Sequence, residues 1–245
     1  MDMEIEGRTA LITGASSGLG RAMAVRFATE GVHVIAVGRR KAQLESLGDE
    51  IYALSGARPV LVTQDLRTEG AVDHIVREAG HGVDIVVNNA GGSAPVSFET
   101  AASEWQSRML VNFERARELA HALLPGMLER RWGRILNITG VQEPRGLNAT
   151  LPAKAALTSW AKGLSRAVAR QGVTVNCIAP GRIYSDQVTR DFTPADVAAF
   201  ADAEIPAGRF GEGEEFADVA LFLVSERARY VTGTTVTVDG GFARA

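Results

Sequence analysis

The stretch from Thr9 to Gly20, TALITGASSGLG, constrains the fold more than any other part of this chain. Its first five residues are mostly apolar and predict a short buried strand. Glycines at positions 14, 18 and 20 follow, and a helix is expected from about Gly18 to Glu30. Glycine is needed where the backbone takes a positive φ or comes close to a ligand, so the turn between this strand and this helix is predicted to be tight.

Such a turn has two interpretations. The first turn of a helix leaves backbone N–H groups unpaired and carries the positive end of the helix dipole, so a phosphate group fits there. The alternative is an ordinary glycine-rich connection. The spacing here is G-x-x-x-G-x-G rather than the more common G-x-G-x-x-G. The flanking strand and helix favour a nucleotide pyrophosphate site, formed by Gly14, Ser16, Ser17, Gly18, Leu19 and Gly20.

Strands and helices alternate along the rest of the chain. Strands are expected at 9–13, 32–37, 59–63, 83–87, 134–138, 173–178 and 234–238. Helices are expected at 41–54, 69–78, 103–130 with a kink or break near Pro125, 151–170 and 213–225. Short, continuous apolar strands separated by helices are typical of a parallel sheet covered on both faces. The 245 residues contain no linker or repeat and predict one α/β domain spanning 1–245.

Composition and charge exclude several classes of protein. The formal net charge is −3, without a basic face that would suit nucleic acid. The acidic N-terminus is unlike a signal peptide, and no apolar run is long enough for a membrane span. The four histidines show no ligand spacing, so no metal site is expected. Cys177 lies in an apolar run and is expected to be a buried thiol. We therefore expect a cytoplasmic protein that binds neither membrane nor nucleic acid.

In a parallel sheet, ligands bind beyond the carboxyl ends of the strands. Arg39 and Arg40 follow the second strand, where an acidic residue would bond the ribose hydroxyls of NAD. Guanidinium groups bind phosphate oxygens, so this pair favours NADP; the alternative is a solvated helix start. Asp65 and Leu66 follow the third strand and are candidates for holding the adenine. After the fourth strand come small residues that can pass beneath a nucleotide, namely Asn89, Ala90 and Gly91.

Together these motifs resemble the classical short-chain dehydrogenase/reductase family, and its 3-oxoacyl-carrier-protein reductases in particular. The matching residues are Thr13-Gly-x-x-x-Gly-x-Gly20, Asp65, Asn88-Asn-Ala-Gly91, Asn112, Lys154, Pro180-Gly181 with Ser185, and Val238-Asp-Gly-Gly241. The resemblance covers essentially the whole chain. It implies a doubly wound (Rossmann) sheet of seven mostly parallel strands with helices on both faces. It also implies that Lys154, Pro180, Gly181, Ile183 and Ser185 contact a nicotinamide cofactor, NADP rather than NAD.

The resemblance also implies a substrate and an assembly. The segment 186–210 is expected to cover a small-molecule or acyl-carrier-linked carbonyl substrate. Its apolar residues, such as Phe192 and Val197, either line the substrate pocket or pack on the sheet. A homotetramer or dimer is expected, because apolar residues at 216–225 and 234–238 exceed what an edge strand should expose.

The sequence departs from the family at the positions that carry the chemistry. Family members have a serine after the fifth strand, which positions the substrate carbonyl, and a Tyr-x-x-x-Lys motif. Their tyrosine donates the proton, and their lysine lowers the pKa of that tyrosine and holds the nicotinamide ribose. Here the serine position falls on Gly140 and the tyrosine position on Thr150, whereas Asn112 and Lys154 are retained. The loop 141–149 is also shorter than usual.

Thr150 therefore has two interpretations. An aliphatic hydroxyl is far less acidic than a phenol, so Thr150 suits the N-cap of a helix with Pro152 in its first turn better than it suits proton donation. Thr139 offers another hydroxyl, and Tyr184 is the phenol expected nearest the nicotinamide. The candidate catalytic residues are Asn112, Lys154, Thr139 and Thr150.

Two functions remain open at this point. The first is an NADP(H)-dependent oxidoreductase with an unusual proton donor, acting in carbonyl or 3-oxoacyl reduction or in alcohol oxidation. The second is a nucleotide-binding protein with little turnover, such as a sensor, scaffold or partner subunit, because a lysine at position 154 would also bind the cofactor ribose. The retained residues on the nicotinamide side favour the enzyme.

Overall fold

The computed structural model describes residues 2–140, 146–185, 188 and 192–243. Within them, seven strands form one sheet in the order β3-β2-β1-β4-β5-β6-β7, and every neighbouring pair is parallel. The strands are β1 (Thr9–Thr13), β2 (His33–Gly38), β3 (Val60–Thr63), β4 (Ile85–Asn88), β5 (Gly133–Ile138), β6 (Val173–Pro180) and β7 (Thr235–Val238). The predicted doubly wound α/β fold is confirmed.

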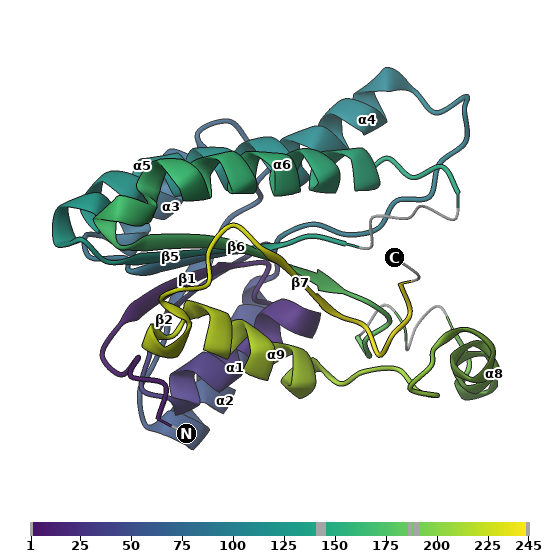
Figure 1. Ribbon diagram of the computed structural model, residues 1–245, viewed down its shortest axis with the longest axis horizontal. Coiled ribbons are helices and arrows are strands. Elements are labelled where there is room, and N and C mark those ends of the chain that lie inside the picture. Colours follow the sequence, from purple (N-terminus) through teal and green to yellow (C-terminus); the bar gives the residue numbers. More distant parts are fainter. Residues whose placement is uncertain (1, 141–145, 186–187, 189–191, 244–245) are drawn as a thin grey trace.

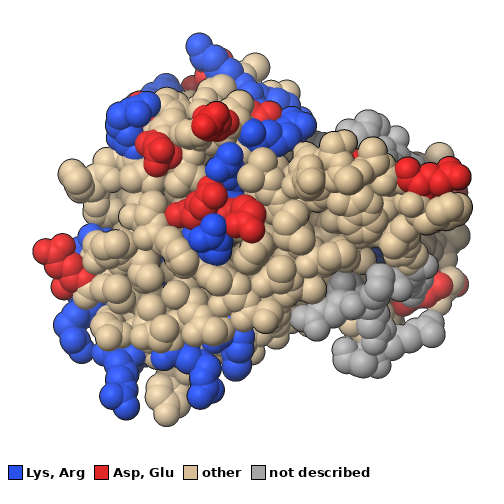
Figure 2. Space-filling view, turned by 90° about the horizontal axis from the view of Figure 1, so that it is seen from above, with Lys and Arg blue, Asp and Glu red and all other residues tan. Residues whose placement is uncertain are grey.

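Helices cover both faces of the sheet, as Figure 1 shows. One layer contains α1 (Gly18–Thr29), α2 (Lys41–Ser55) and α9 (Gly213–Val224). The other contains α3 (Ala71–Ala79), α4 (Ala102–Met109), α5 (Arg115–Arg130) and α6 (Leu151–Val168). A further helix, α8 (Pro194–Glu204), lies outside both layers near β7. Seen over the second layer, the surface carries its charged side chains in separate groups with wide uncharged stretches between them (Figure 2).

The strands are continuously apolar because both of their faces are buried. Consecutive residues of a strand point to opposite sides of a sheet. In β1, Ile12 packs with Phe27 of α1 and Phe216 of α9, whereas its neighbour Leu11 packs with Leu119 of α5 in the other layer. One hydrophobic core therefore lies on each face of the sheet, and together the two cores fix the position of every strand end.

The order of the strands reverses between β1 and β4. The chain winds outward from β1 to β3 along one half of the sheet and returns to β4 on the other side of β1. Connections leaving β1 and β4 therefore run in opposite directions, which opens a crevice at their carboxyl ends. This crevice contains the candidate site.

The predicted elements agree with the structure except in the long helix before β5. Of the kink or break expected near Pro125, the break is wrong, because α5 continues through that residue. Leu123 and Met127, before and after the proline, are both part of the core. The interruption lies earlier, where a π-helical segment, Leu110–Glu114, separates α4 from α5. Short π-helical segments are frequent at functional sites, and this one carries the buried Asn112.

Two further expectations have clear outcomes. Cys177 is buried as predicted, with 2% of its surface exposed. Most of the apolar residues at 216–225, one ground for expecting an oligomer, are instead buried within the protein, where Phe216, Leu221 and Val224 of α9 are part of the core. In the ranges given above, no helix is both long enough and apolar enough to cross a membrane.

Candidate active site and cofactor cleft

The connections after β1 and β4 are joined by one hydroxyl group. Thr13 Oγ1 accepts hydrogen bonds from the backbone N–H groups of Asn89 and Ala90, both at 3.0 Å, and donates to Val87 O at 3.3 Å. In return, the Asn89 side chain donates to Thr13 O at 2.9 Å. The sequence motif includes Thr13 but does not show this role, which depends on a partner 76 residues away.

The glycine turn is as tight as the sequence predicts. Gly14 and Gly18 have φ values of 69° and 54°, in the left-handed region that favours glycine. A Cβ atom on Gly20 would lie 2.3 Å from Gly14 O, so no larger residue fits there without moving the backbone. This close approach brings the start of α1 against the end of β1.

The N-terminus of α1 is available to an anion. Ser17 is the N-cap residue of α1, but its side chain makes no capping hydrogen bond. Its hydroxyl instead accepts a hydrogen bond from the Arg40 guanidinium, which also reaches Ser16 Oγ at 3.3 Å. The first-turn N–H groups of α1 therefore have no side-chain cap, and a guanidinium lies beside them. This is the arrangement that binds a phosphate.

A cleft with two halves runs along the carboxyl edge of the sheet. The halves meet at Gly14, Ser17, Ala90 and Gly91, which line both. The first half lies beyond β2 and β3, where the predicted residues Ser16, Arg39, Arg40, Asp65 and Leu66 come together. The second half has a volume of about 420 Å³ and extends toward β5 and β6.

Asp65 is held at the mouth of the first half. The Arg67 side chain donates two hydrogen bonds to its Oδ2, at 2.8 and 3.3 Å, and one to its Oδ1, at 3.2 Å, and the Arg67 backbone N–H donates to Oδ1 at 2.9 Å. This pairing holds the pKa of the Asp65 carboxyl below its usual value. The carboxylate is therefore ionised and oriented, as the proposed contact with an adenine amino group requires, although sequence reasoning did not identify Arg67.

The second half of the cleft contains most of the other predicted residues. Its lining includes Gly18 and Leu19 from α1, Asn89, Thr139, Thr150, Lys154, Pro180, Gly181, Ile183 and Ser185. It also includes Ser93 and Asn148, which are hydrogen bonded to each other at 3.0 Å, and Arg182. Sequence reasoning missed these three residues. The segment at 141–145 and parts of 186–210 lie outside the described residues.

Lys154 lies at the inner end of this second half. Its side chain is buried, and Nζ donates to Ile138 O at 2.6 Å. Desolvation lowers the pKa of the ammonium group to about 8. Burial also raises the pKa of the nearby Cys177 thiol to about 11, so that the thiol is neutral at physiological pH.

Asn112 borders the first half of the cleft and is close to Gly91. Its Nδ2 donates to Arg108 O at 2.9 Å, whereas its buried Oδ1 has no hydrogen-bond partner among the described residues. A Cβ atom on Gly91 would lie 2.3 Å from that oxygen and 3.3 Å from Lys154 Nζ. Gly91 is therefore required by the close approach of these two side chains.

The structure corrects the interpretation of Thr150. The residue occupies the N-cap position of α6, but its backbone is helical and its side chain makes no cap hydrogen bond. Its hydroxyl donates instead to Gly92 O at 2.7 Å, and its N–H bonds Asn148 Oδ1 at 2.8 Å. Thr150 therefore ties the start of α6 to the loop after β4, a contact between segments far apart in sequence.

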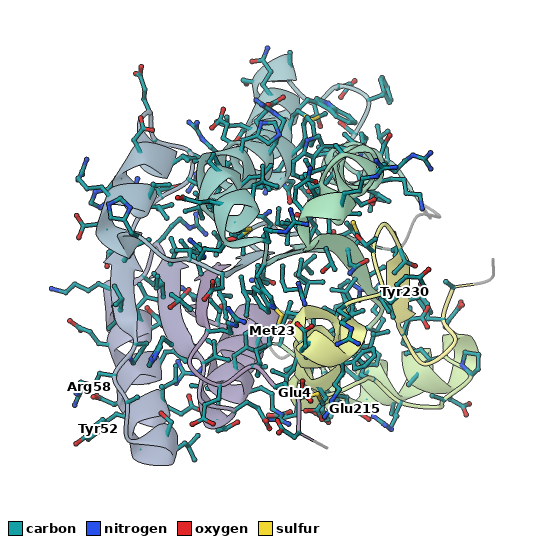
Figure 3. The ribbon with its side chains drawn as sticks, turned by 60° about the vertical axis from the view of Figure 1, so that its left-hand side comes forward. Glu4, Met23, Tyr52, Arg58, Glu215 and Tyr230 are labelled. Atoms are coloured by element: carbon teal, nitrogen blue, oxygen red, sulfur yellow. The ribbon has the colours of Figure 1, made fainter. Side chains whose placement is uncertain are left out.

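None of the three tyrosines lines the cleft, and all three lie in the described ranges. Tyr52 packs on Arg58 at the outer edge of α2, and Tyr230 is 99% exposed on the other side of the molecule (Figure 3). Tyr184 stacks against Phe210, with ring centroids 5.5 Å apart, and faces a separate groove beside α1. The suggestion that Tyr184 replaces the family tyrosine is therefore not supported.

Comparisons with known proteins agree with the site. A family model described as enoyl-(acyl carrier protein) reductase matches residues 14–243. The 3-oxoacyl-[acyl-carrier-protein] reductase of Escherichia coli is 36% identical over 243 residues, which cover 98% of each chain. The chain belongs to the short-chain dehydrogenase/reductase family.

Solved structures extend this likeness to the whole fold. L-Sorbose reductase from Gluconobacter frateurii, crystallised with NADPH and L-sorbose, is 35% identical with a TM-score of 0.93, and the match covers 100% of both chains. An NADPH-dependent reductase involved in bacilysin biosynthesis is 30% identical with a TM-score of 0.89, covering 97% of this chain and 99% of the other. The predicted family and oxidoreductase class are confirmed, and the alternative of a nucleotide-binding protein without turnover is not favoured.

The contact between Thr150 and Gly92 leads to a stability prediction. Thr150→Val removes the hydroxyl and should lower the free energy of unfolding by about 1 kcal/mol, the usual net contribution of such a hydrogen bond. Thr150→Ser keeps the donor and should stay closer to the native value. Urea unfolding of the three proteins measures this difference. If Thr150→Val and the native protein were equally stable, the contact would contribute nothing to folding.

Proposed function

We propose that this protein is an NADP(H)-dependent oxidoreductase that reduces a carbonyl compound, or oxidises the corresponding alcohol. The observation that carries this proposal is the cleft itself. It continues from Arg39 and Arg40, past the glycine turn, to the buried Lys154. Its two halves suit the two ends of a dinucleotide, and the substrate would lie in the second half.

The residues of the cleft fit a nicotinamide dinucleotide. Gly14, Ser16, Ser17, Gly18, Leu19 and Gly20 would hold the pyrophosphate against the uncapped start of α1. Asn89, Ala90 and Gly91 would pass beneath the nucleotide, with Lys154, Pro180, Gly181, Ile183 and Ser185 around the nicotinamide end. The unpaired Asn112 Oδ1 is a further acceptor beside the cleft. When bound, the nicotinamide supplies or accepts a hydride.

The adenine end favours a 2′-phosphate. Arg39 and Arg40 follow β2, and both line the first half of the cleft. Arg40 already bonds the serines of the glycine turn, so Arg39 is the better candidate for the phosphate. The solved reductases reported above support this choice, because one was crystallised with NADPH and the other is NADPH-dependent.

The substrate-side lining is mixed. Ser93, Asn148 and Thr139 offer polar groups, whereas Val188 and Phe192 add an apolar wall. Among the relatives, one is named for an acyl-carrier-linked 3-oxo compound and another for a ketose. We infer a small carbonyl compound as the substrate of this chain, either unattached or linked to an acyl carrier.

The proposal predicts turnover with NADPH and a cofactor preference. Purified protein should oxidise NADPH when given acetoacetyl-coenzyme A or L-sorbose as probes, followed by NADPH absorbance. Calorimetry should find NADPH bound roughly tenfold or more tighter than NADH, because a charged hydrogen bond contributes about 1.5–3 kcal/mol. Arg39→Asp should reverse this preference by repelling the phosphate and offering an acceptor to the ribose.

Arg58→Asp is the matched control for this test. It makes the same change of charge at an exposed position just after the end of α2, where Arg58 pairs with Asp49. The preference for NADPH should survive this change. Equal affinity of the native protein for both cofactors would refute the role of Arg39, and absence of any turnover across a wider panel of ketones and alcohols would refute the oxidoreductase.

We also propose that the protein assembles as a homodimer or homotetramer through its C-terminal edge. The strand β7 ends the sheet, and its residues are mostly half-buried. Phe222 and Tyr230 nearby are exposed, at 37% and 99%. An exposed strand edge beside large apolar side chains favours association.

Multi-angle light scattering at micromolar concentration tests this assembly and should give two or four times the mass of the chain. Tyr230→Asp should shift the distribution toward smaller species, since a carboxylate at an apolar interface is costly. A monomer in the native protein would contradict the proposal.

A further inference from the structure

Carbonyl reduction requires a proton as well as a hydride, and the donor of that proton is not evident from the family pattern. The serine and tyrosine positions hold Gly140 and Thr150, and the three tyrosines lie away from the cleft. The four histidines are all described, and none of them lines either half. The hydroxyl hydrogens of Thr139 and Thr150 are already donated, to Ile178 O and Gly92 O. These observations direct attention to a different group.

The Lys154 ammonium is placed for this role. The residue lines the second half of the cleft together with Thr139, Gly140 and Thr150. An ammonium group has three N–H donors, and the hydrogen bond to Ile138 O uses one of them. This bond anchors Nζ at the end of β5, two residues before the position where the family carries its serine.

The two small residues leave room for a substrate beside this lysine. A Cβ atom built on Gly140 meets only Leu151 Cδ2 among the described atoms within 4 Å, at 3.8 Å. Thr150 is far smaller than a tyrosine, and its hydroxyl points to the loop after β4. Space that a serine and a phenol would fill is thus part of the cleft that Lys154 lines.

We propose that Lys154 Nζ, in the half of the cleft that Gly140 and Thr150 also line, is itself the proton donor to the substrate carbonyl oxygen in this protein. This inference rests on the proposed function. The bound reduced nicotinamide supplies the hydride to the carbonyl carbon. One N–H bond of the ammonium breaks, its electron pair stays on nitrogen, and an O–H bond forms on the former carbonyl oxygen. Lys154 is left as a neutral amine, which water reprotonates before the next turnover.

The surroundings of Lys154 suit a donor that works near neutral pH. Burial lowers the pKa of the ammonium to about 8, and a general acid is most effective when its pKa lies near the working pH. The charged or titratable groups around it are Cys177 from β6, Arg115 from α5 and Arg182 after β6. The thiol is neutral near pH 8, and Arg115 is paired with Glu118. The groups that shift the pKa of the ammonium include no carboxylate.

The first experiment measures the pH dependence of reduction. With NADPH and the better of the two probes, acetoacetyl-coenzyme A or L-sorbose, kcat/KM should fall tenfold per pH unit above a break near pH 8, because only the ammonium form donates. Lysine labelled with ¹³C at Cε should show, by NMR, a resonance that is absent from Lys154→Met and titrates at the same pH. This second measurement does not depend on turnover.

Variants distinguish proton donation from ribose binding. Lys154→Arg keeps a cation and its hydrogen-bond donors but holds its proton far more tightly. It should bind NADPH within a few-fold of the native affinity, lose roughly 10²–10⁴ in kcat, and show no break near pH 8. Lys162→Arg is the matched control on the exposed part of α6, where Lys162 bonds Gly233 O, and it should keep the native rate and pH profile.

The same assays contain the outcomes that would overturn the inference. A native rate independent of pH between 7 and 9.5, or a break that persists in Lys154→Arg, would show that another group donates the proton. A loss of 10²-fold or more in Thr150→Val, with its folding and NADPH binding intact, would transfer the role to Thr150. If the native protein binds NADPH but reduces no carbonyl compound, the proposed function fails and this inference fails with it.

Discussion

The site depends on the contact between the ends of β1 and β4. Thr13 Oγ1 receives two backbone N–H groups from the connection after β4, and the Asn89 side chain returns a bond to Thr13 O. Gly20 lies so close to Gly14 O that a methyl group would displace the backbone. These contacts set the distance between the α1 N-terminus and the loop at Gly91. This joint between β1 and β4 positions the rest of the cleft, because one connection leaves it toward β2 and the other toward β5.

This joint also explains why the sequence predicts the glycine turn after β1 well. Strands buried on both faces are continuously apolar, and a glycine forced by a close approach stands out within them. The signals at Gly14, Gly18 and Gly20 are local, so they appear in the sequence without knowledge of the partner segments. Asp65 and Arg67 are only two residues apart in the sequence, so their pairing could have been predicted in the same way.

The second half of the cleft was less predictable because its contacts join distant segments. Thr150 reads as a helix cap, since threonine before a proline-containing first turn is a common start of a helix. Its hydroxyl instead bonds Gly92, 58 residues earlier, and no local pattern encodes that partner. The π-helical segment around Asn112 was missed for a different reason. Proline is a strong local signal for a break, whereas one wider helical turn changes the periodicity of apolar residues only slightly.

Burial destabilises the charged ammonium form of Lys154 but not its neutral amine form, and this difference connects stability with chemistry. Desolvation penalises the ammonium but not the neutral amine, so the folded protein loses free energy by keeping the charge in the cleft. A family tyrosine that gives up its proton becomes an anion and needs a neighbouring cation to stabilise it. A lysine that gives up its proton becomes neutral in the same apolar surroundings and needs no such partner. Loss of the tyrosine therefore removes one acid while leaving in place a second group whose deprotonation the buried site itself favours.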